Sequence, residues 1–195
     1  MKTNSLALLR FFPCLFGMAA WLAVPVPRAE ASSVWNNAGT SFTASSDWTG
    51  GLSSGGSASF GATAPVYQPY LDASFSLSGL SVAAGANGYV LTGASGASLT
   101  ITGTGSGSGS AIYVATGGNL VLDVPVVFSP STGSAYVTAT GLSSSLVFNG
   151  VISGSTALNI GGRVALNSAA NTYTGDTYIV GGQNLITVAS FGTGG

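Results

Sequence analysis

The side chains that could do chemistry in this sequence are few. The chain contains no histidine, and beyond residue 31 it contains no lysine, cysteine or glutamate. The charged residues in that part of the chain are one cation and four anions: Arg163, Asp47, Asp72, Asp123 and Asp176. A nucleophilic triad needs a histidine or lysine base, and a transition-metal site needs histidine or cysteine ligands. We therefore expect neither kind of site there.

The four aspartates leave carboxylate chemistry as the main enzymatic alternative. A glycosidase-type site needs two carboxylates roughly 5–10 Å apart, and a calcium site needs several acids together. The aspartates are far apart in the sequence, so only a fold that stacks distant segments would join two of them. Asp123 precedes Val124-Pro125 and Asp176 follows Gly175, and both positions are typical of turns and strand ends. We predict that the protein is not an enzyme and has no catalytic, cofactor-binding or metal-binding residues.

Two further features bear on ligand binding. Residues 103–110 alternate glycine with serine or threonine, but they lack the G-x-G-x-x-G spacing and the following helix of a phosphate site, so we interpret them as a flexible loop. Four tyrosines could present an aromatic surface to sugars, although packing on the exterior or in the core is the commoner role: Tyr67, Tyr70, Tyr113 and Tyr136. One cation against four anions leaves a net charge of −3. Proteins bind nucleic acid through clustered lysine and arginine residues, so we do not expect a nucleic-acid partner.

The first residues have the pattern of a secretory signal. Lys2 and Arg10 precede an apolar run over 11–24, and Ala29-Glu30-Ala31 has small residues where signal peptidase requires them. The run is shorter than the roughly 20 residues that span a membrane, and prolines interrupt it. We therefore predict a signal peptide over residues 1–31, cleavage before Ser32, and export to the cell surface, the outer membrane or the medium.

The remaining sequence predicts an all-β fold. No window shows the 3.6-residue apolar period of a helix. Short groups of β-branched and aromatic residues recur every 8–12 residues or so between glycines, which favours β structure over Gly/Ser-rich disorder. The predicted strands are 88–92, 97–102, 111–114, 119–124, 126–128, 135–138, 145–148, 157–160, 164–166, 178–180 and 185–188.

The strand pattern favours a parallel β-helix over a sandwich or barrel. The strands are very short, and many alternate one aliphatic residue with one small polar residue, as in Leu99-Thr100-Ile101-Thr102. A β-solenoid needs that alternation, because aliphatic residues stack inside each coil and small polar residues face water. We expect roughly 20–25 residues per coil. The aromatic residues before position 61 predict an N-terminal cap. Prolines bound an edge connection at 65–70, and we group the cap and this connection as one segment over 32–70. The coils are expected over 71–195.

One stretch near the end of the chain resembles a known repeat. Its segments follow one another in this order: Val164-Ala165-Leu166, Asn171-Thr172-Tyr173-Thr174-Gly175, Thr177-Tyr178-Ile179-Val180 and Gly181-Gly182-Gln183-Asn184-Leu185. Residues 161–195 are similar to the autotransporter-associated β-strand repeat, also called the passenger-associated transport repeat. They depart from it at Asp176, where glycine is usual, and at Gln183-Asn184, where Gly-Thr is usual. The opening from Trp35 to Gly61 is similar to the segment that follows the signal in large proteins carrying these repeats.

The resemblance implies a right-handed parallel β-helix, exported as the passenger of an autotransporter and partnered by a C-terminal β-barrel translocator outside this chain. The pattern would start another coil at 191–195, so we expect a truncated reading frame or a fragment of a longer protein. The expected function is a non-enzymatic structural or adhesive stalk, with cell-surface or polysaccharide ligands and with self-association through open β edges. The alternative is a secreted β-helix that binds or acts on polysaccharide.

Overall fold

The computed structural model describes residues 32–105, 110–181 and 185–193. These residues form an all-β solenoid of about six turns, which confirms the predicted fold class. The predicted signal peptide, residues 106–109 of the predicted loop and residues 182–184 of the predicted corner lie outside the described residues. The strands are β1 (Ser33–Trp35), β2 (Trp48–Thr49), β3 (Ser57–Phe60), β4 (Tyr70–Leu71), β5 (Phe75–Leu77), β6 (Gly79–Val82), β7 (Tyr89–Gly93), β8 (Leu99–Ile101), β9 (Ile112–Val114), β10 (Asn119–Leu122), β11 (Val126–Phe128), β12 (Ala135–Ala139), β13 (Ser145–Phe148), β14 (Ile152–Gly154), β15 (Leu158–Leu166), β16 (Thr177–Ile179) and β17 (Leu185–Val188), with one short 3-10 helix, η1 (Ser45–Asp47).

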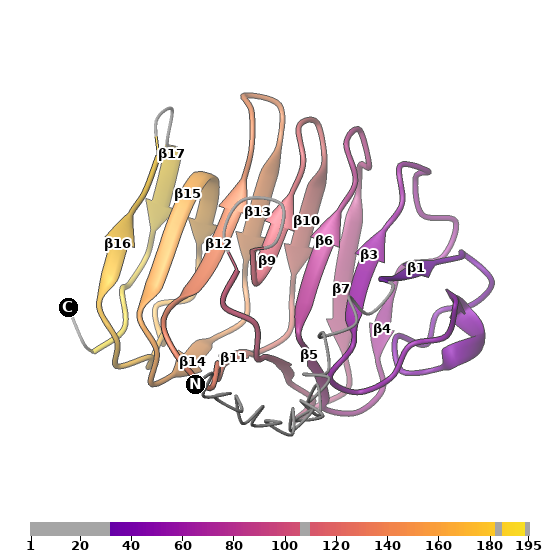
Figure 1. Cartoon of the computed structure of the whole chain (residues 1–195), viewed down its shortest axis with the longest axis horizontal. Coiled ribbons are helices and arrows are strands. Elements are labelled where there is room, and N and C mark those ends of the chain that lie inside the picture. Colours follow the sequence, from indigo (N-terminus) through magenta and orange to yellow (C-terminus); the bar gives the residue numbers. More distant parts are fainter. Residues whose placement is uncertain (1–31, 106–109, 182–184, 194–195) are drawn as a thin grey trace, which may run out of the picture.

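The strands of successive coils pair in parallel and form three faces that run along the long axis (Figure 1). Face 1 contains β1, β3, β6, β9, β12, the first half of β15, and β16. Face 2 contains β4, β7, β10, β13, the second half of β15, and β17. Face 3 contains β5, β8, β11 and β14. Because each coil contributes one short segment to each face, residues about one coil apart in sequence become neighbours in space.

The coils differ in length. Partners on face 1 are 22 residues apart at Ser57↔Gly79, 32 at Leu80↔Ile112, 25 at Ile112↔Val137 and 19 at Leu158↔Thr177. The longest coil contains residues 103–110, so the glycine-rich stretch is an insertion in an otherwise regular coil. The strand that follows the insertion, β9, keeps its parallel pairing with β6 and β12.

Alternation within each strand forms the core. Leu120, Leu146 and Val164 lie one above the other in successive coils of face 2, and each is at most 2% exposed. Burying an aliphatic side chain of this size stabilises the fold by roughly 1.5–3 kcal/mol. Parallel strands lie about 4.8 Å apart, so inward side chains that are paired in register in neighbouring coils touch. The core is therefore continuous along the axis.

One predicted corner proved to be part of a strand. The sequence suggested separate strands at 157–160 and 164–166, whereas β15 runs without interruption from Leu158 to Leu166. Gly162 has a positive φ of 77°, which bends β15 between face 1 and face 2. The strand therefore pairs with β12 and β16 by its first half and with β13 and β17 by its second half.

Aromatic residues fill the N-terminal end of the core. Trp48 packs edge-on against Trp35 and Phe42, with ring centroids 5.1 and 5.0 Å apart. The Trp48 indole nitrogen donates to the Phe42 carbonyl at 2.8 Å. Above this cluster β1 pairs antiparallel with β2 while its other edge pairs parallel with β3. Both edges of the first strand are thus at least partly paired, and the cap over 32–70 stays a prediction.

Several short strands were not predicted. β5, β6 and β14 have only three or four residues each, and β6 begins with glycine while β14 ends with it. Such segments have little strand propensity of their own. Parallel pairing holds them extended: β6 pairs with β3 and β9, whereas β5 pairs with β8 alone and β14 with β11 alone among the described strands. Within the described ranges, no helix has the length and apolar character needed to cross a membrane.

Candidate functional site

The structure brings two of the four aspartates together. Asp47 is buried, and its carboxylate accepts hydrogen bonds from the Ser41 backbone nitrogen at 3.0 Å and the Ser46 hydroxyl at 3.2 Å. Asp72 accepts from the Ser41 hydroxyl and, at 3.3 Å, from the Thr43 hydroxyl. Both carboxylates therefore bind the same loop. Bonding of this kind stabilises the loop between β1 and β2.

The other two aspartates lie in separate places. Asp123, just after β10, accepts from the Asn149 amide at 2.6 Å. Asp176, just before β16, accepts from the Tyr178 hydroxyl at 3.0 Å, and this hydrogen bond raises the pKa of Tyr178. In the part of the chain that the structure describes, no cluster of three or more aspartate, glutamate, histidine or cysteine side chains could hold a metal ion.

The four candidate tyrosines do not share one surface. Tyr67 and Tyr70 are 46% and 39% exposed and lie in or just after the connection that leads to β4. Tyr113 and Tyr136 are half-buried on face 1, where the Tyr113 hydroxyl shares a 3.4 Å hydrogen bond with Thr140. A single aromatic platform built from all four is therefore not present.

The Asn-Thr-Tyr-Thr-Gly stretch forms a structural corner. Asn171 is buried, and its amide accepts from the Ile152 backbone nitrogen at 2.9 Å and donates to the Ser190 carbonyl at 2.8 Å. The Tyr173 ring is fully buried and its hydroxyl shares a 2.9 Å hydrogen bond with Thr177. A Cβ on Gly175 would overlap the Thr156 backbone. Within this motif, the Asn171 side chain joins neighbouring coils, and Gly175 permits a close approach to the preceding coil.

Face 2 presents a regular outer surface that sequence reasoning missed. One edge carries a ladder of polar side chains: the Ser145 hydroxyl donates to Asn119 at 2.5 Å, and the Asn119 amide donates to Asn87 at 2.5 Å. The strand register places Arg163 next in this row, because Leu146 pairs with Val164. The row therefore ends in the one cation found beyond residue 31.

A second ladder runs along the opposite edge of face 2. Asn167 donates to Asn149 at 2.8 Å, and Asn149 in turn donates to Asp123. All three side chains are exposed at the ends of their strands. Asn119 and Asp123 are four residues apart on one extended segment, so the two ladders are separated by roughly 13 Å.

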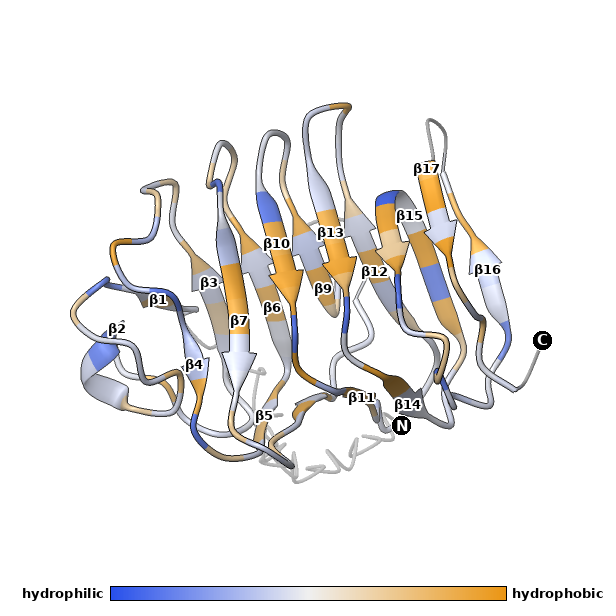
Figure 2. Ribbon diagram, turned by 180° about the vertical axis from the view of Figure 1, so that it is seen from behind, coloured by the Kyte–Doolittle hydropathy of each residue, from blue (hydrophilic) through white to orange (hydrophobic). Residues whose placement is uncertain are grey.

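An apolar row lies between the two ladders. Val90, Val121 and Val147 pair in register, followed by Ala165 and Thr187 in the next two coils. The three valines and Ala165 point outward but are only partly exposed. Figure 2 shows hydrophobic residues in the middle of β7, β10 and β13 and hydrophilic residues where β10 and β13 end. We call this surface, with its two ladders and apolar row, the face 2 track.

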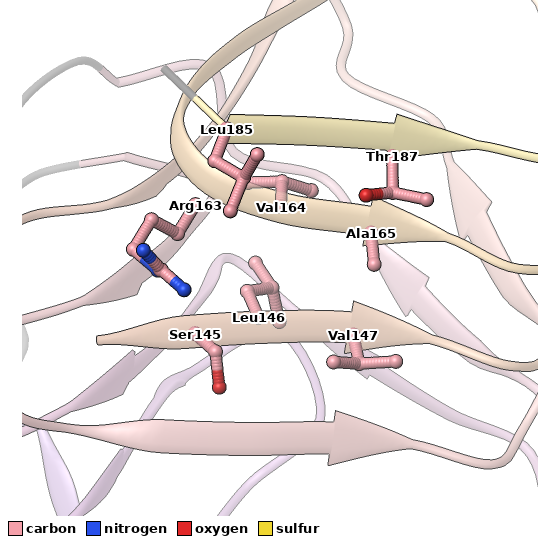
Figure 3. Close-up of a pocket in the computed structure, with 8 residues that line it drawn as sticks. All are labelled: Ser145, Leu146, Val147, Arg163, Val164, Ala165, Leu185 and Thr187. Atoms are coloured by element: carbon pink, nitrogen blue, oxygen red, sulfur yellow. The ribbon is translucent and has the colours of Figure 1, made fainter. Parts of the chain in front are cut away.

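A small hollow interrupts the track at its C-terminal half. Eight residues line it: Ser145, Leu146, Val147, Arg163, Val164, Ala165, Leu185 and Thr187. Figure 3 shows the Arg163 side chain extending from β15 toward β13, beside Ser145. No residue that the structure describes accepts a hydrogen bond from the Arg163 guanidinium or pairs with it. The hollow therefore combines aliphatic side chains with hydroxyl groups and one guanidinium.

The last described coil exposes apolar side chains. Ile179, Leu185 and Phe191 are 52%, 54% and 46% exposed, whereas Ile160, the partner of Ile179 in the preceding coil, is 1% exposed. Residues 176–179 and Phe191 line a shallow hollow there. Self-association through this edge stays a prediction.

Comparisons with protein-family models, with curated proteins and with solved structures gave no match to this chain. The function is therefore inferred from the geometry of the fold. It provides a continuous stacked core, corners joined by side-chain amides, and one face on which polar and apolar residues repeat from coil to coil.

Proposed function

We propose that this chain is an exported, non-enzymatic stalk: a β-helical spacer of the kind found in autotransporter passengers, displayed at the bacterial cell surface or in the medium. The observation that carries the proposal is the continuous core, in which residues such as Leu120, Leu146 and Val164 stack in register through successive coils. A structure built this way lengthens by about 4.8 Å with each coil and is held along its whole length by backbone pairing.

The mechanical role follows from how the coils are joined. Every coil contacts only the coils before and after it, so stability accumulates by nearest-neighbour stacking. Side-chain amides add further links: the Gln68 side chain donates to the Gly88 carbonyl at 2.7 Å and accepts from the Val90 nitrogen at 2.8 Å, as a paired strand would. Such a rod resists bending and proteolysis because few backbone groups are free to adopt a protease-accessible conformation.

The composition supports export before folding. The part of the chain beyond residue 31 has five charged residues and no cysteine, so no disulfide can form within it before translocation. Coils can then assemble outside the cell from the aromatic end, where Trp35, Phe42 and Trp48 form a compact cluster that the first coils can pack against.

The test is to follow the chain in the bacterium that makes it. We expect the outer-membrane or medium fraction to contain a product that begins at Ser32, as read by N-terminal mass spectrometry. We also expect it to resist protease added to intact cells. Replacement of Ala31 by a bulky residue (Ala31→Phe) should block processing, because signal peptidase requires a small side chain there. A product that keeps residues 1–31 and stays in the cytoplasm would overturn the proposal.

A further inference from the structure

The face 2 track has the repeat geometry of a site for a linear polymer. Its two ladders run parallel to the solenoid axis, one through Asn119 and Ser145 and the other through Asn149 and Asn167. The same chemistry recurs about every 4.8 Å along the axis. A compact ligand would contact one or two coils, whereas an extended chain lying along the axis would meet polar groups from each coil that the ladders join.

The cross-section of the track matches a polysaccharide. Sugar rings have apolar C–H faces and hydroxyl groups around their rims. The apolar row of Val121, Val147 and Ala165 offers a flat aliphatic surface to the ring faces. Each asparagine amide in the ladders has two donor hydrogens, and the bonds within a ladder use one of them. The remaining amide groups can bond hydroxyl groups at the rims.

Charge selects the kind of polysaccharide. Arg163 lies in the hollow without an anionic partner among the described residues. Asp123 belongs to the other ladder, where its carboxylate accepts a hydrogen bond from Asn149. A guanidinium presents a planar pair of N–H donors that matches a carboxylate. We propose that the face 2 track binds a linear acidic polysaccharide along the solenoid axis, with the Arg163 guanidinium holding one of its carboxylates. This inference deepens the proposed stalk role, on which it rests for its biological setting, by naming the ligand of an adhesive surface.

The experiment measures binding of the purified chain to alginate, a linear uronate polymer, by isothermal titration calorimetry. Dextran is the neutral control polymer and dextran sulfate the sulfated one. We expect binding to alginate but not to dextran, and weaker binding as salt rises because the Arg163 contact is partly exposed. Arg163→Gln should weaken alginate binding about 10-fold or more, since a hydrogen bond to a charged group is lost. Arg163→Lys should restore part of the affinity.

A matched control separates the guanidinium from net charge. Thr100→Glu on face 3 lowers the net charge by one unit, as Arg163→Gln does, but lies on a different face of the solenoid. We expect this variant to bind alginate like the unchanged protein. An equal loss in both variants, no binding to alginate, or equally tight binding to dextran would each overturn the proposal. Binding to dextran sulfate alone would overturn the choice of a carboxylate ligand.

Two further readouts separate polysaccharide binding from self-association and from failed export. If face 2 is instead a contact between two copies of the chain, light scattering will show a dimer that Val147→Asp converts to a monomer, and the proposal fails. Surface display of Arg163→Gln, measured by antibody labelling of intact cells, should be unchanged. Lost binding with normal display leaves the stalk role intact, whereas a chain that binds alginate but is never exported would contradict the stalk role and leave the site standing.

Discussion

The side chain of Asn171 replaces a backbone partner for Ile152. The Ile152 nitrogen donates to the Asn171 Oδ1 at 2.9 Å, and the amide nitrogen of the same side chain donates to Ser190, one coil further on. One buried amide thus links three successive coils on a face where regular strand pairing has ended. This gives a physical reason for the asparagine that begins the motif at 171–175.

The first prediction concerns this amide. Asn171→Ala should lower the free energy of unfolding by about 1–3 kcal/mol, because it leaves a buried donor and acceptor without partners. Asn171→Asp keeps an acceptor for Ile152 but points a charge at the Ser190 carbonyl. Burial and that carbonyl should raise the pKa of the introduced carboxyl above its unfolded value. The free energy of unfolding of Asn171→Asp, relative to that of the unchanged protein, should therefore rise as pH falls from about 7 to about 4, as measured by urea titration at each pH. Equal stability of all three proteins would contradict this role.

The second prediction concerns the bend in β15. Gly162 has a φ of 77°, and a Cβ there would overlap the Ala139 carbonyl oxygen in the adjacent coil. Gly96 has a similar φ of 81°, but a Cβ added at Gly96 would have open space around it, with no other part of the chain within 4 Å. Gly96→Ala should cost about 1 kcal/mol from backbone strain alone. Gly162→Ala should cost distinctly more in thermal or urea unfolding, and equal costs would show that the close approach to Ala139 is unimportant.

The third prediction follows from coil stacking. Ile112 pairs with Val137, so deletion of residues 112–136 removes one register period of 25 residues and puts Val137 where Ile112 was. We expect this variant to keep a β-sheet circular dichroism spectrum and cooperative unfolding, since each coil contacts only its neighbours. Deletion of 112–123 removes half a coil and shifts inward residues out of register. It should unfold or aggregate, and tolerance of both deletions would argue against a registered core.

The fourth prediction uses the buried phenol of Tyr89. Its hydroxyl donates to the Thr63 carbonyl at 2.8 Å, and burial raises the pKa of Tyr89 above 10. The unfolded chain therefore loses this proton at a lower pH than the folded chain, so stability is full below about pH 10 and falls as pH rises above it. Tyr89→Phe should be about 1 kcal/mol less stable at pH 8, where a hydrogen bond is lost. It should also lose less stability between pH 10 and 11.5, in chemical denaturation at each pH.

The sequence determined the class of fold through local patterns. Alternation such as Leu99-Thr100-Ile101 can bury only one side of a strand, and glycines at positions such as Gly96 permit the positive φ of a corner. The absence of histidine, lysine and cysteine beyond residue 31 likewise limits the chemistry available there through composition alone. These conclusions depend on single residues and their immediate neighbours, which the sequence displays directly.

Only the tertiary structure decided which distant residues meet. The distance between parallel partners varies from 18 to 32 positions, so the ladder of Asn119, Ser145 and Arg163 has no fixed sequence period. For the same reason the sequence did not show that Asp47 and Asp72 bind one serine, or that β15 passes through its corner as one strand. Local propensity determines that a segment is extended, but its partner is chosen by the register that buries the whole aliphatic stack at once.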